Sequence, residues 1–135
     1  MNEQGGFETD FLSLPYYGEI STGKCLDKHK EISRINIPCY LNVSKKCFVL
    51  KMPGTTMQSS GIFHSDLLII QPSSTATNGN IVVATIDNIE TVIKHFEQTN
   101  DLIILSSKNA DVKPMIFDPS RIKISGFLVS QMRIY

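Results

Sequence analysis

The sequence has no excess of charge of either sign. Its 135 residues carry 13 Lys and Arg against 13 Asp and Glu, so the formal net charge is zero. A nucleic-acid-binding surface needs clustered Lys and Arg side chains. The nearest approach to one is a short basic run over residues 24–30, which Asp27 interrupts and Glu31 follows. This alternation of signs indicates a solvated loop or turn.

Cysteine is scarce, and long apolar runs are missing. The three cysteines, Cys25, Cys39 and Cys47, are odd in number and fit no zinc-binding spacing. The sequence has no secretory segment, so we expect reduced thiols in a cytoplasmic protein. No apolar run reaches the ~18 residues of a membrane span. We expect no membrane insertion, no metal site and no cofactor.

The length allows one domain with a real core and is too short for two comfortable ones. Residues 1–13 begin polar and Gly-containing, and this composition predicts a mobile N-terminal arm. Residues 14–25 contain Pro15, Gly18 and Gly23, which indicate extended chain with turns and no helix.

From residue 38 onward, short β-branched and apolar segments alternate with turn signals. The segments are CFVLKM, DLLIIQ, IVVATI, ETVIKHF, DLIILSS and RIKISGFLVSQMRIY. Asn78-Gly79 is a strong turn signal, and Asp87-Asn88 predicts a hairpin between two of the strands. Gly126 predicts a bulge or bend in the last strand. The one helical signal is a single turn at residues 57–61, so the spacing predicts an all-β sandwich or barrel-like sheet.

Six pieces of this sequence, in order, resemble the LexA/UmuD family of self-cleaving serine peptidases. LPYYGEISTG is similar to the cleavage-site region of the family, and GTTM followed by GIFHSDLLII is similar to its Gly-Asp-Ser-Met and the strand after it. NGNIVVATID, IKHF, KNADVKPM and ISGFLV are similar to its later motifs. The resemblance runs from Leu14 to Arg133. It implies a LexA/signal-peptidase-like β-sheet domain, partly closed and barrel-like, over residues 24–135, with residues 1–23 as a flexible arm.

In this family a Ser and a Lys form the catalytic dyad, and the chemistry needs both. A hydroxyl is a poor nucleophile until a base takes its proton, and a Lys is a base only when neutral. Burial in an apolar site lowers the pKa of a Lys. The resemblance puts Thr56 at the Ser position and Thr55 at the preceding Asp position. Thr keeps the hydroxyl but adds a methyl group that stiffens the side chain.

The position of the Lys depends on the register of the hairpin. Counting from Val82 without a gap puts the family Lys on Ile93, and the dyad is then lost. One extra residue in the turn near Asn88 puts it on Lys94, and the interval from Lys94 to Asn109 then equals that of the family. We favour Lys94, because the other register needs an insertion and a compensating deletion. His95 is expected to face away from the dyad, and His64 is expected in an exposed turn.

The resemblance also names a substrate, which is the arm of the chain itself. The family cuts between a small residue and a Gly, and Thr22-Gly23 occupies that bond here. Thr22 is larger and β-branched, so it fits a tight pocket less well, while Gly23 keeps the flexibility needed to enter a cleft. The nucleophile and the cleavage site therefore each carry an added branched methyl group. Two outcomes stay open, a slow self-cleaver or a pseudopeptidase that works as a homodimeric interaction module.

The cellular role follows from the resemblance alone. Only 13 residues precede Leu14, too few for the DNA-binding domain of LexA, so direct sequence-specific DNA binding is not expected. A short arm on a peptidase-like domain is similar to UmuD and implies a role in the SOS response to DNA damage. The implied partners are a second copy of the chain, the RecA filament and an error-prone DNA polymerase in translesion synthesis. A peptidase-like domain that belongs to a longer repressor is the third hypothesis.

Overall fold

The computed structural model describes residues 10–20, 26 and 30–135. Over these residues the chain forms nine strands and three short 3-10 turns. The strands are β1 (Phe11–Glu19), β2 (Ser33–Pro38), β3 (Phe48–Lys51), β4 (Leu67–Pro72), β5 (Ile81–Ile86), β6 (Glu90–Thr99), β7 (Leu102–Ser106), β8 (Met115–Phe117) and β9 (Ile122–Met132). The 3-10 turns are η1 (Cys39–Leu41), η2 (Gln58–Ser60) and η3 (Pro119–Arg121). The predicted all-β fold class is confirmed.

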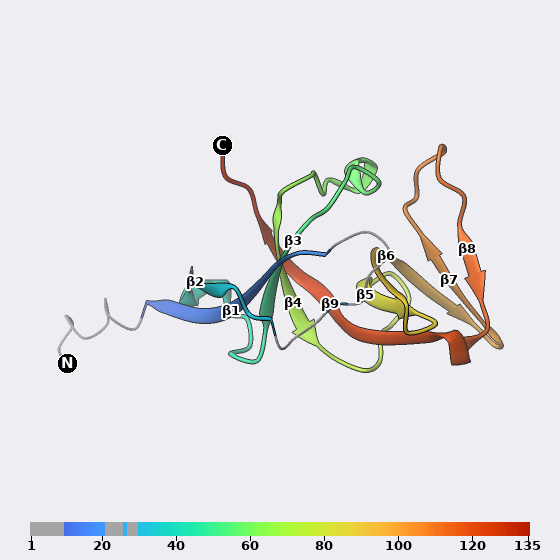
Figure 1. Cartoon of the computed structure of the whole chain (residues 1–135), viewed down its shortest axis with the longest axis horizontal. Coiled ribbons are helices and arrows are strands. Elements are labelled where there is room, and N and C mark those ends of the chain that lie inside the picture. Colours follow the sequence, from blue (N-terminus) through green and yellow to red (C-terminus); the bar gives the residue numbers. More distant parts are fainter. Residues whose placement is uncertain (1–9, 21–25, 27–29) are drawn as a thin grey trace.

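The strands form one mixed sheet in the order β2-β1-β3-β4-β9-β5-β6-β7-β8. The β1–β3 pair is parallel, and the other neighbouring pairs are antiparallel. The sheet stays open, with β2 and β8 as its edges, and β9 crosses the middle of the molecule between its two ends (Figure 1).

Two irregularities let β9 pair with β4 along one edge and with β5 along the other. The register against β4 shifts between Ile69 and Ile70, and the register against β5 shifts between Val83 and Ala84. Gly126 lies at the second shift, where an added Cβ would meet the backbone oxygen of Gln71 and lie 2.7 Å from Ile70 Cγ2. Only a residue without a Cβ fits this close approach. The bend predicted at Gly126 is confirmed.

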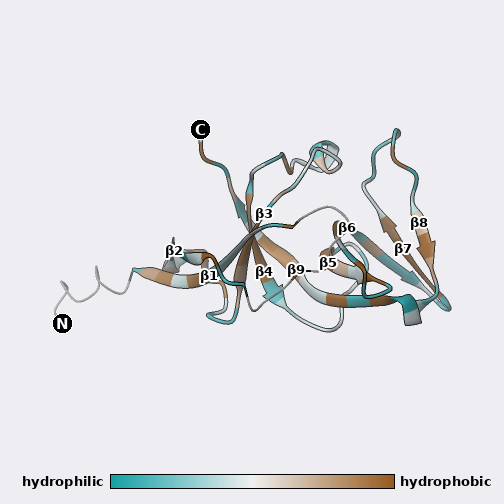
Figure 2. Cartoon of the chain, in the orientation of Figure 1, coloured by the Kyte–Doolittle hydropathy of each residue, from teal (hydrophilic) through white to brown (hydrophobic). Residues whose placement is uncertain are grey.

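Three clusters of buried apolar side chains hold the sheet together. One joins β1, β2, β3 and β4, and a second joins β5, β6, β7, β8 and β9. The third joins β3, β4, β5, β6, Ile20 and the loop that follows β3. Hydrophobic residues concentrate on the strands and hydrophilic ones on the connecting loops (Figure 2). Burial of this apolar surface is the main favourable term in folding.

The hairpin and turn predictions for the later part of the chain are also confirmed. β5 and β6 pair from Ile86↔Glu90 to Ile81↔His95, and Asp87 and Asn88 in the turn both have positive φ. The single helical turn predicted at residues 57–61 is η2, which ends at Gly61 with φ of 83°.

The N-terminal segment differs from the prediction. Residues 11–13 belong to β1, which pairs with β2 from Phe11↔Pro38 to Tyr16↔Ser33, so they are not a mobile arm. The composition of residues 1–13 does not indicate this strand, because the strands that pair with it come later in the chain. The extended, helix-free chain predicted from residue 14 agrees with β1. The boundary at residue 23 lies outside the described residues and stays a prediction.

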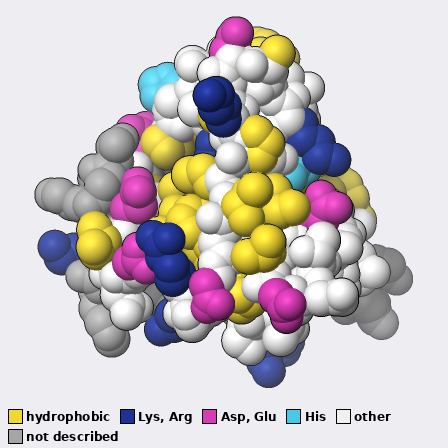
Figure 3. Space-filling view, turned by 90° about the vertical axis from the view of Figure 1, so that its right-hand side faces the viewer, with side chains coloured by type: hydrophobic (Ala, Val, Ile, Leu, Met, Phe, Trp, Pro, Cys, Tyr) yellow, Lys and Arg dark blue, Asp and Glu magenta, His cyan; other side chains and the backbone are white. Residues whose placement is uncertain are grey.

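The end of the molecule that carries β7 and β8 has a central group of hydrophobic side chains bordered by charged ones (Figure 3). Exposed large hydrophobic residues on the C-terminal strands include Leu102, Ile116 and Val129. Within the described part of the chain, no helix is long and apolar enough to cross a membrane.

Candidate active site

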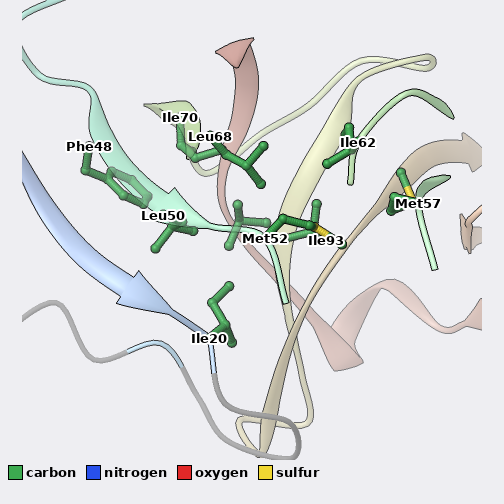
Figure 4. Packing of buried hydrophobic residues seen from close by; sticks show 10 residues of the cluster. Ile20, Phe48, Leu50, Met52, Met57, Ile62, Leu68, Ile70 and Ile93 are labelled. Carbon is green, nitrogen blue, oxygen red and sulfur yellow. The ribbon is translucent and has the colours of Figure 1, made fainter. Parts of the chain in front are cut away.

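The candidate nucleophile, Thr56, lies in the loop between β3 and β4. Gly54 has φ of 66°, which turns the chain away from β3, and Thr55 and Thr56 follow with exposed side chains. The next side chain, Met57, is completely buried in the cluster that also contains Met52, Ile62 and Ile93 (Figure 4). Met57 therefore anchors the turn, while the hydroxyl one residue earlier stays accessible.

The candidate base, Lys94, lies on β6 opposite Val82 of β5. Lys94 is only 8% exposed to solvent. Its Nζ donates a hydrogen bond of 2.6 Å to Oγ of Ser107, which is fully buried. Burial lowers the pKa of the Lys94 amine below its ordinary value of 10.5. The physical cause is desolvation, which disfavours the charged ammonium form.

Thr56 and Lys94 line one pocket of about 210 Å³. Residues 90–94 of β6 form one wall, and the other residues that line it are Ile20, Met52, Pro53, Gly54 and Thr56. Ile93, the alternative to Lys94, packs into the apolar cluster beside Met52. A hydroxyl, an amine of lowered pKa and an apolar floor thus share one site.

Two serines after Thr56 connect its turn to β6, which carries Lys94, and to the residues directly after β7, where Ser107 lies. Ser60 Oγ lies 2.7 Å from His95 Nε2, and Ser59 Oγ donates to the backbone oxygens of Ser107 at 3.5 Å and Lys108 at 3.3 Å. Burial, and secondarily the charge of Lys108, lowers the pKa of His95. No role was predicted for His95 from the sequence. It lies on β6 directly after Lys94, and its contact with Ser60 holds the turn against that strand.

The far side of the same loop is held by the C-terminal end of the chain. Asp66 is 1% exposed and pairs with Arg133 through contacts of 2.8 Å to Oδ1 and 2.9 Å to Oδ2. The Asp66 carboxylate also accepts the Phe63 N–H at 2.9 Å, and the Gln131 side chain donates to the Gly61 oxygen at 2.9 Å. The hydrogen bond from Arg133 is the main reason that the pKa of Asp66 is lowered.

The predicted cleavage bond, Thr22-Gly23, lies outside the described residues, but both of its flanks reach the site. Ile20 is 6% exposed, lines the pocket and packs into the same apolar cluster as Met57 (Figure 4). Leu26 packs against that cluster, and its N–H donates to Thr91 Oγ1 at 2.8 Å. Thr91 also lines the pocket and pairs with the buried Thr85 hydroxyl at 3.0 Å.

Sequence reasoning missed Ser107, His95, Thr91 and the serines after Thr56. For Ser107 a signal was present. The two-residue turn at Asn100-Asp101 pairs Thr99 with Leu102 and His95 with Ser106, and continuing that register puts Ser107 opposite Lys94. The contacts of Ser59, Ser60 and Leu26 join segments far apart in the chain, which no local pattern indicates.

The other residues singled out in the sequence are His64 and the three cysteines. His64 is exposed in a turn as expected, with its Nε2 3.5 Å from Glu19 Oε2. Cys39 is exposed and Cys47 is buried, while Cys25 lies outside the described residues. Among the described side chains, no group of three or more His, Cys, Asp and Glu could hold a metal ion.

Comparison with known proteins identifies the family of this chain. The Peptidase S24-like family profile matches residues 15–129. The chain is 37% identical over 136 residues to a LexA repressor of Pelagibacter ubique, covering 96% of this chain and 60% of that protein. It is 32% identical over 128 residues to a LexA repressor of Zymomonas mobilis, with 95% and 59% covered. It is 34% identical over 125 residues to one of Gluconobacter oxydans, with 92% and 52% covered.

The chain thus spans between 52% and 60% of the length of these relatives, and the match extends over nearly all of it. The family profile begins within β1, ends within β9, and covers both the loop that carries Thr56 and the strand that carries Lys94. This chain belongs to the Peptidase S24-like family, the family of LexA and UmuD.

Proposed function

We propose that this protein is a self-cleaving peptidase of the LexA/UmuD type that cuts its own Thr22-Gly23 bond. Thr56 is the nucleophile and Lys94 is the general base. One observation carries the proposal, which is that Thr56, Lys94 and Ile20 line the same pocket. Ile20 is two residues from the candidate bond, so hydroxyl, base and substrate segment come together at one place.

The environment of Lys94 suits a general base. A protonated amine cannot accept the hydroxyl proton, and burial lowers the pKa of Lys94, which makes the neutral amine more populated at a given pH. The hydrogen bond with Ser107 Oγ fixes the direction of the amine. Lys94 is therefore the stronger choice for the base over Ile93, which has no titratable group.

The two flanks of the candidate bond favour cleavage within one chain. Ile20 lines the pocket and the Leu26 N–H is bonded to Thr91 at its wall. Only residues 21–25 connect these anchors, and an extended residue spans at most about 3.6 Å. The connecting segment is therefore short, and a reaction between groups of one chain avoids the entropy cost of a bimolecular encounter.

The proposed reaction has two steps. Lys94 Nζ takes the Thr56 hydroxyl proton as Thr56 Oγ1 bonds to the carbonyl carbon of Thr22. The bond to the Gly23 nitrogen then breaks, and the leaving amine takes the proton from Lys94. In the second step, water attacks the Thr56 ester, giving a free carboxylate on Thr22 and restoring the hydroxyl.

The experiment is to incubate the purified chain alone at alkaline pH, and separately with RecA–single-stranded DNA filaments, and to record intact mass. Cutting between residues 22 and 23 is expected under at least one condition. Thr56→Val keeps the shape and removes the hydroxyl, so it should not cut, whereas Thr56→Ser removes only the methyl and should cut at least as fast. If neither the native chain nor Thr56→Ser is cut, the peptidase proposal is wrong and the pseudopeptidase hypothesis takes its place.

The flank contact offers a separate test of cleavage in one chain. Thr91→Val removes the acceptor of the Leu26 N–H without a large change of shape. It should slow self-cleavage by roughly 5-fold, corresponding to about 1 kcal/mol for one hydrogen bond. The matched control is Thr85→Val, which removes the hydroxyl that pairs with Thr91 and leaves the Leu26 contact in place. Equal slowing by Thr85→Val and Thr91→Val would contradict the anchoring role.

We infer that the protein acts in the SOS response as a homodimer. Family membership and the name LexA repressor of its relatives support the SOS role. The hydrophobic group at the β7–β8 end supports a dimer face that includes the C-terminal strands (Figure 3). Light scattering of the native chain and of Ile116→Asp tests the dimer, which the variant should weaken. Retention on RecA filaments and on an error-prone polymerase tests the other proposed partners.

A further inference from the structure

The strand upstream of the candidate bond is an internal strand of the sheet. β1 lies between β2 and β3, antiparallel to the first and parallel to the second. Among the described residues, β2 pairs with β1 and with no other strand. If β1 left, β2 would lose its ladder partner and β3 would gain a free edge, and unpaired strand edges readily take up another strand.

Side chains add to the backbone pairing of β1. Leu14 is completely buried with Ile37 and Val49 from the strands on either side. Arg34 of β2 donates to Ser13 Oγ at 2.8 Å and to the Ser13 backbone oxygen at 2.9 Å. The Tyr17 ring lies edge-on to Phe48 of β3, with 5.7 Å between centroids. β1 is therefore held by β2 from Phe11 to Tyr16 and by β3 from Tyr16 to Glu19.

We propose that the gap between β2 and β3 is a peptide-binding site, which β1 occupies in the intact chain and keeps occupying after a cut between residues 22 and 23. The inference rests on the proposed function for its biological meaning, because self-cleavage is what would make the cut. The cut breaks no contact of β1 with β2 or β3. It converts an intramolecular ligand into a bimolecular one, so the tether's effective concentration is lost and β1 becomes exchangeable.

The described contacts define what this site accepts. The ligand is an extended peptide that adds a strand, with main-chain hydrogen bonds for affinity and one deep apolar contact at the Leu14 position. The position of Gly18 is also restrictive, since its φ is +79° and an added Cβ would lie 2.5 Å from Ile32 Cδ1. A second extended segment with an apolar residue and a Gly four positions later would compete with β1.

The test makes the cut with an external protease, so its result does not depend on Thr56. In the full-length chain, residues 21–25 are replaced by the recognition sequence of a site-specific protease. After complete cutting, native mass spectrometry should find both pieces together. A fluorescent peptide of residues 10–20 should then exchange into the cut protein, with a rise in anisotropy, and should bind the uncut chain at least about 100-fold more weakly, because the tethered β1 acts as a competitor at millimolar effective concentration.

The matched control is the same peptide with Leu14→Asp, which should bind at least about 30-fold more weakly than the native peptide, since a buried Leu contact is lost. Protection of β2 backbone amides from hydrogen exchange should be the same before and after cutting, because β1 still pairs with them. The proposal is overturned if the native peptide does not bind the cut protein, or if the two peptides bind equally. An absence of self-cleavage in the native chain would contradict the proposed function and leave this result unaffected.

Discussion

The two halves of the candidate site are built in different ways. Lys94 lies on β6 in a regular ladder with β5, is nearly buried, and has its hydrogen-bond partner Ser107 directly after β7. Thr56 is exposed on a loop that returns to the sheet only at Leu67. That loop is held by the buried Met57, by Ser60 with His95, and by the C-terminal end of the chain.

This difference separates the chemical part of the site from the adjustable part. Regular pairing fixes the position of the base, and burial lowers its pKa. The hydroxyl depends on contacts with segments from 35 to 70 positions away in the chain. Changes on the Lys94 side should therefore alter the chemistry and its pH dependence, and changes on the Thr56 side should alter stability and positioning.

The largest expected effect is on the base side. Lys94→Met keeps the apolar stem and removes the amine, so self-cleavage should fall by roughly 100- to 10,000-fold, the usual contribution of a general base. Stability at neutral pH should change little, because relief from burying the amine offsets the lost hydrogen bond with Ser107. Intact mass against time and urea unfolding measure the two quantities. The control is Lys123→Met on the exposed surface of β9, which should leave both unchanged.

The second effect is on the hydroxyl side and is mainly structural. Met57→Ala empties a fully buried site directly after Thr56, and should lower the free energy of unfolding by about 2–4 kcal/mol. Self-cleavage should slow as well, with the pH dependence of the remaining activity unchanged, because Lys94 keeps its surroundings. The matched control is Gln58→Ala, next along the chain and exposed. A Met57→Ala variant as stable as Gln58→Ala would show that the turn is not anchored by Met57.

The same contrast explains what the sequence could predict. The hairpin between β5 and β6 has its turn signal at Asp87-Asn88 and apolar runs on both sides, so its strands follow from local pattern. The turn at residues 57–61 likewise ends at a Gly with positive φ. The base side of the site was therefore within reach, including Ser107 through the register of the next hairpin.

Other features depend on pairing between distant segments and were out of reach. β1 has a Pro and a Gly in its interior, which argue against a strand by propensity, and its partners β2 and β3 supply the stabilisation that overrides this. The ion pair of Asp66 with Arg133 joins residues 67 positions apart. No periodicity within one segment contains that information.

The pH dependence of the cleavage rate should report on Lys94 and its partner Ser107. Because the folded pKa of Lys94 is lowered, the cleavage rate should rise with pH and level off below the ordinary 10.5. Ser107→Ala removes the oxygen that accepts from the ammonium form, so the midpoint should move further down. The plateau should also fall by roughly 10-fold, since one buried hydrogen bond contributes about 1–1.5 kcal/mol to positioning. The control is Ser106→Ala. A lower plateau with an unmoved midpoint would mean that Ser107 acts only on structure.

The smallest effect is expected at the contact between the two halves. Ser60→Ala removes the 2.7 Å contact between the turn and His95 Nε2 on β6. The contacts of Ser59 with the residues after β7 remain. Self-cleavage should slow by about 2- to 5-fold, corresponding to a net hydrogen bond of about 0.5–1 kcal/mol. The midpoint of the pH profile should stay where it is, since Lys94 and Ser107 are untouched. Ser59→Ala, whose contacts are 3.3 and 3.5 Å, should have a smaller effect still.

His95 gives this last contact a pH dependence of its own. Its folded pKa is below the ordinary 6.5, so its neutral form contributes stability that is present above pH 6.5 and is lost as pH falls from there through the folded pKa. The native chain should therefore lose stability on mild acidification, and His95→Gln, which cannot be protonated, should lose less. Urea unfolding at pH 7.5 and pH 5 measures the difference. An equal loss in both proteins would assign the acid sensitivity to other groups and leave His95 as a neutral hydrogen-bond partner of the turn.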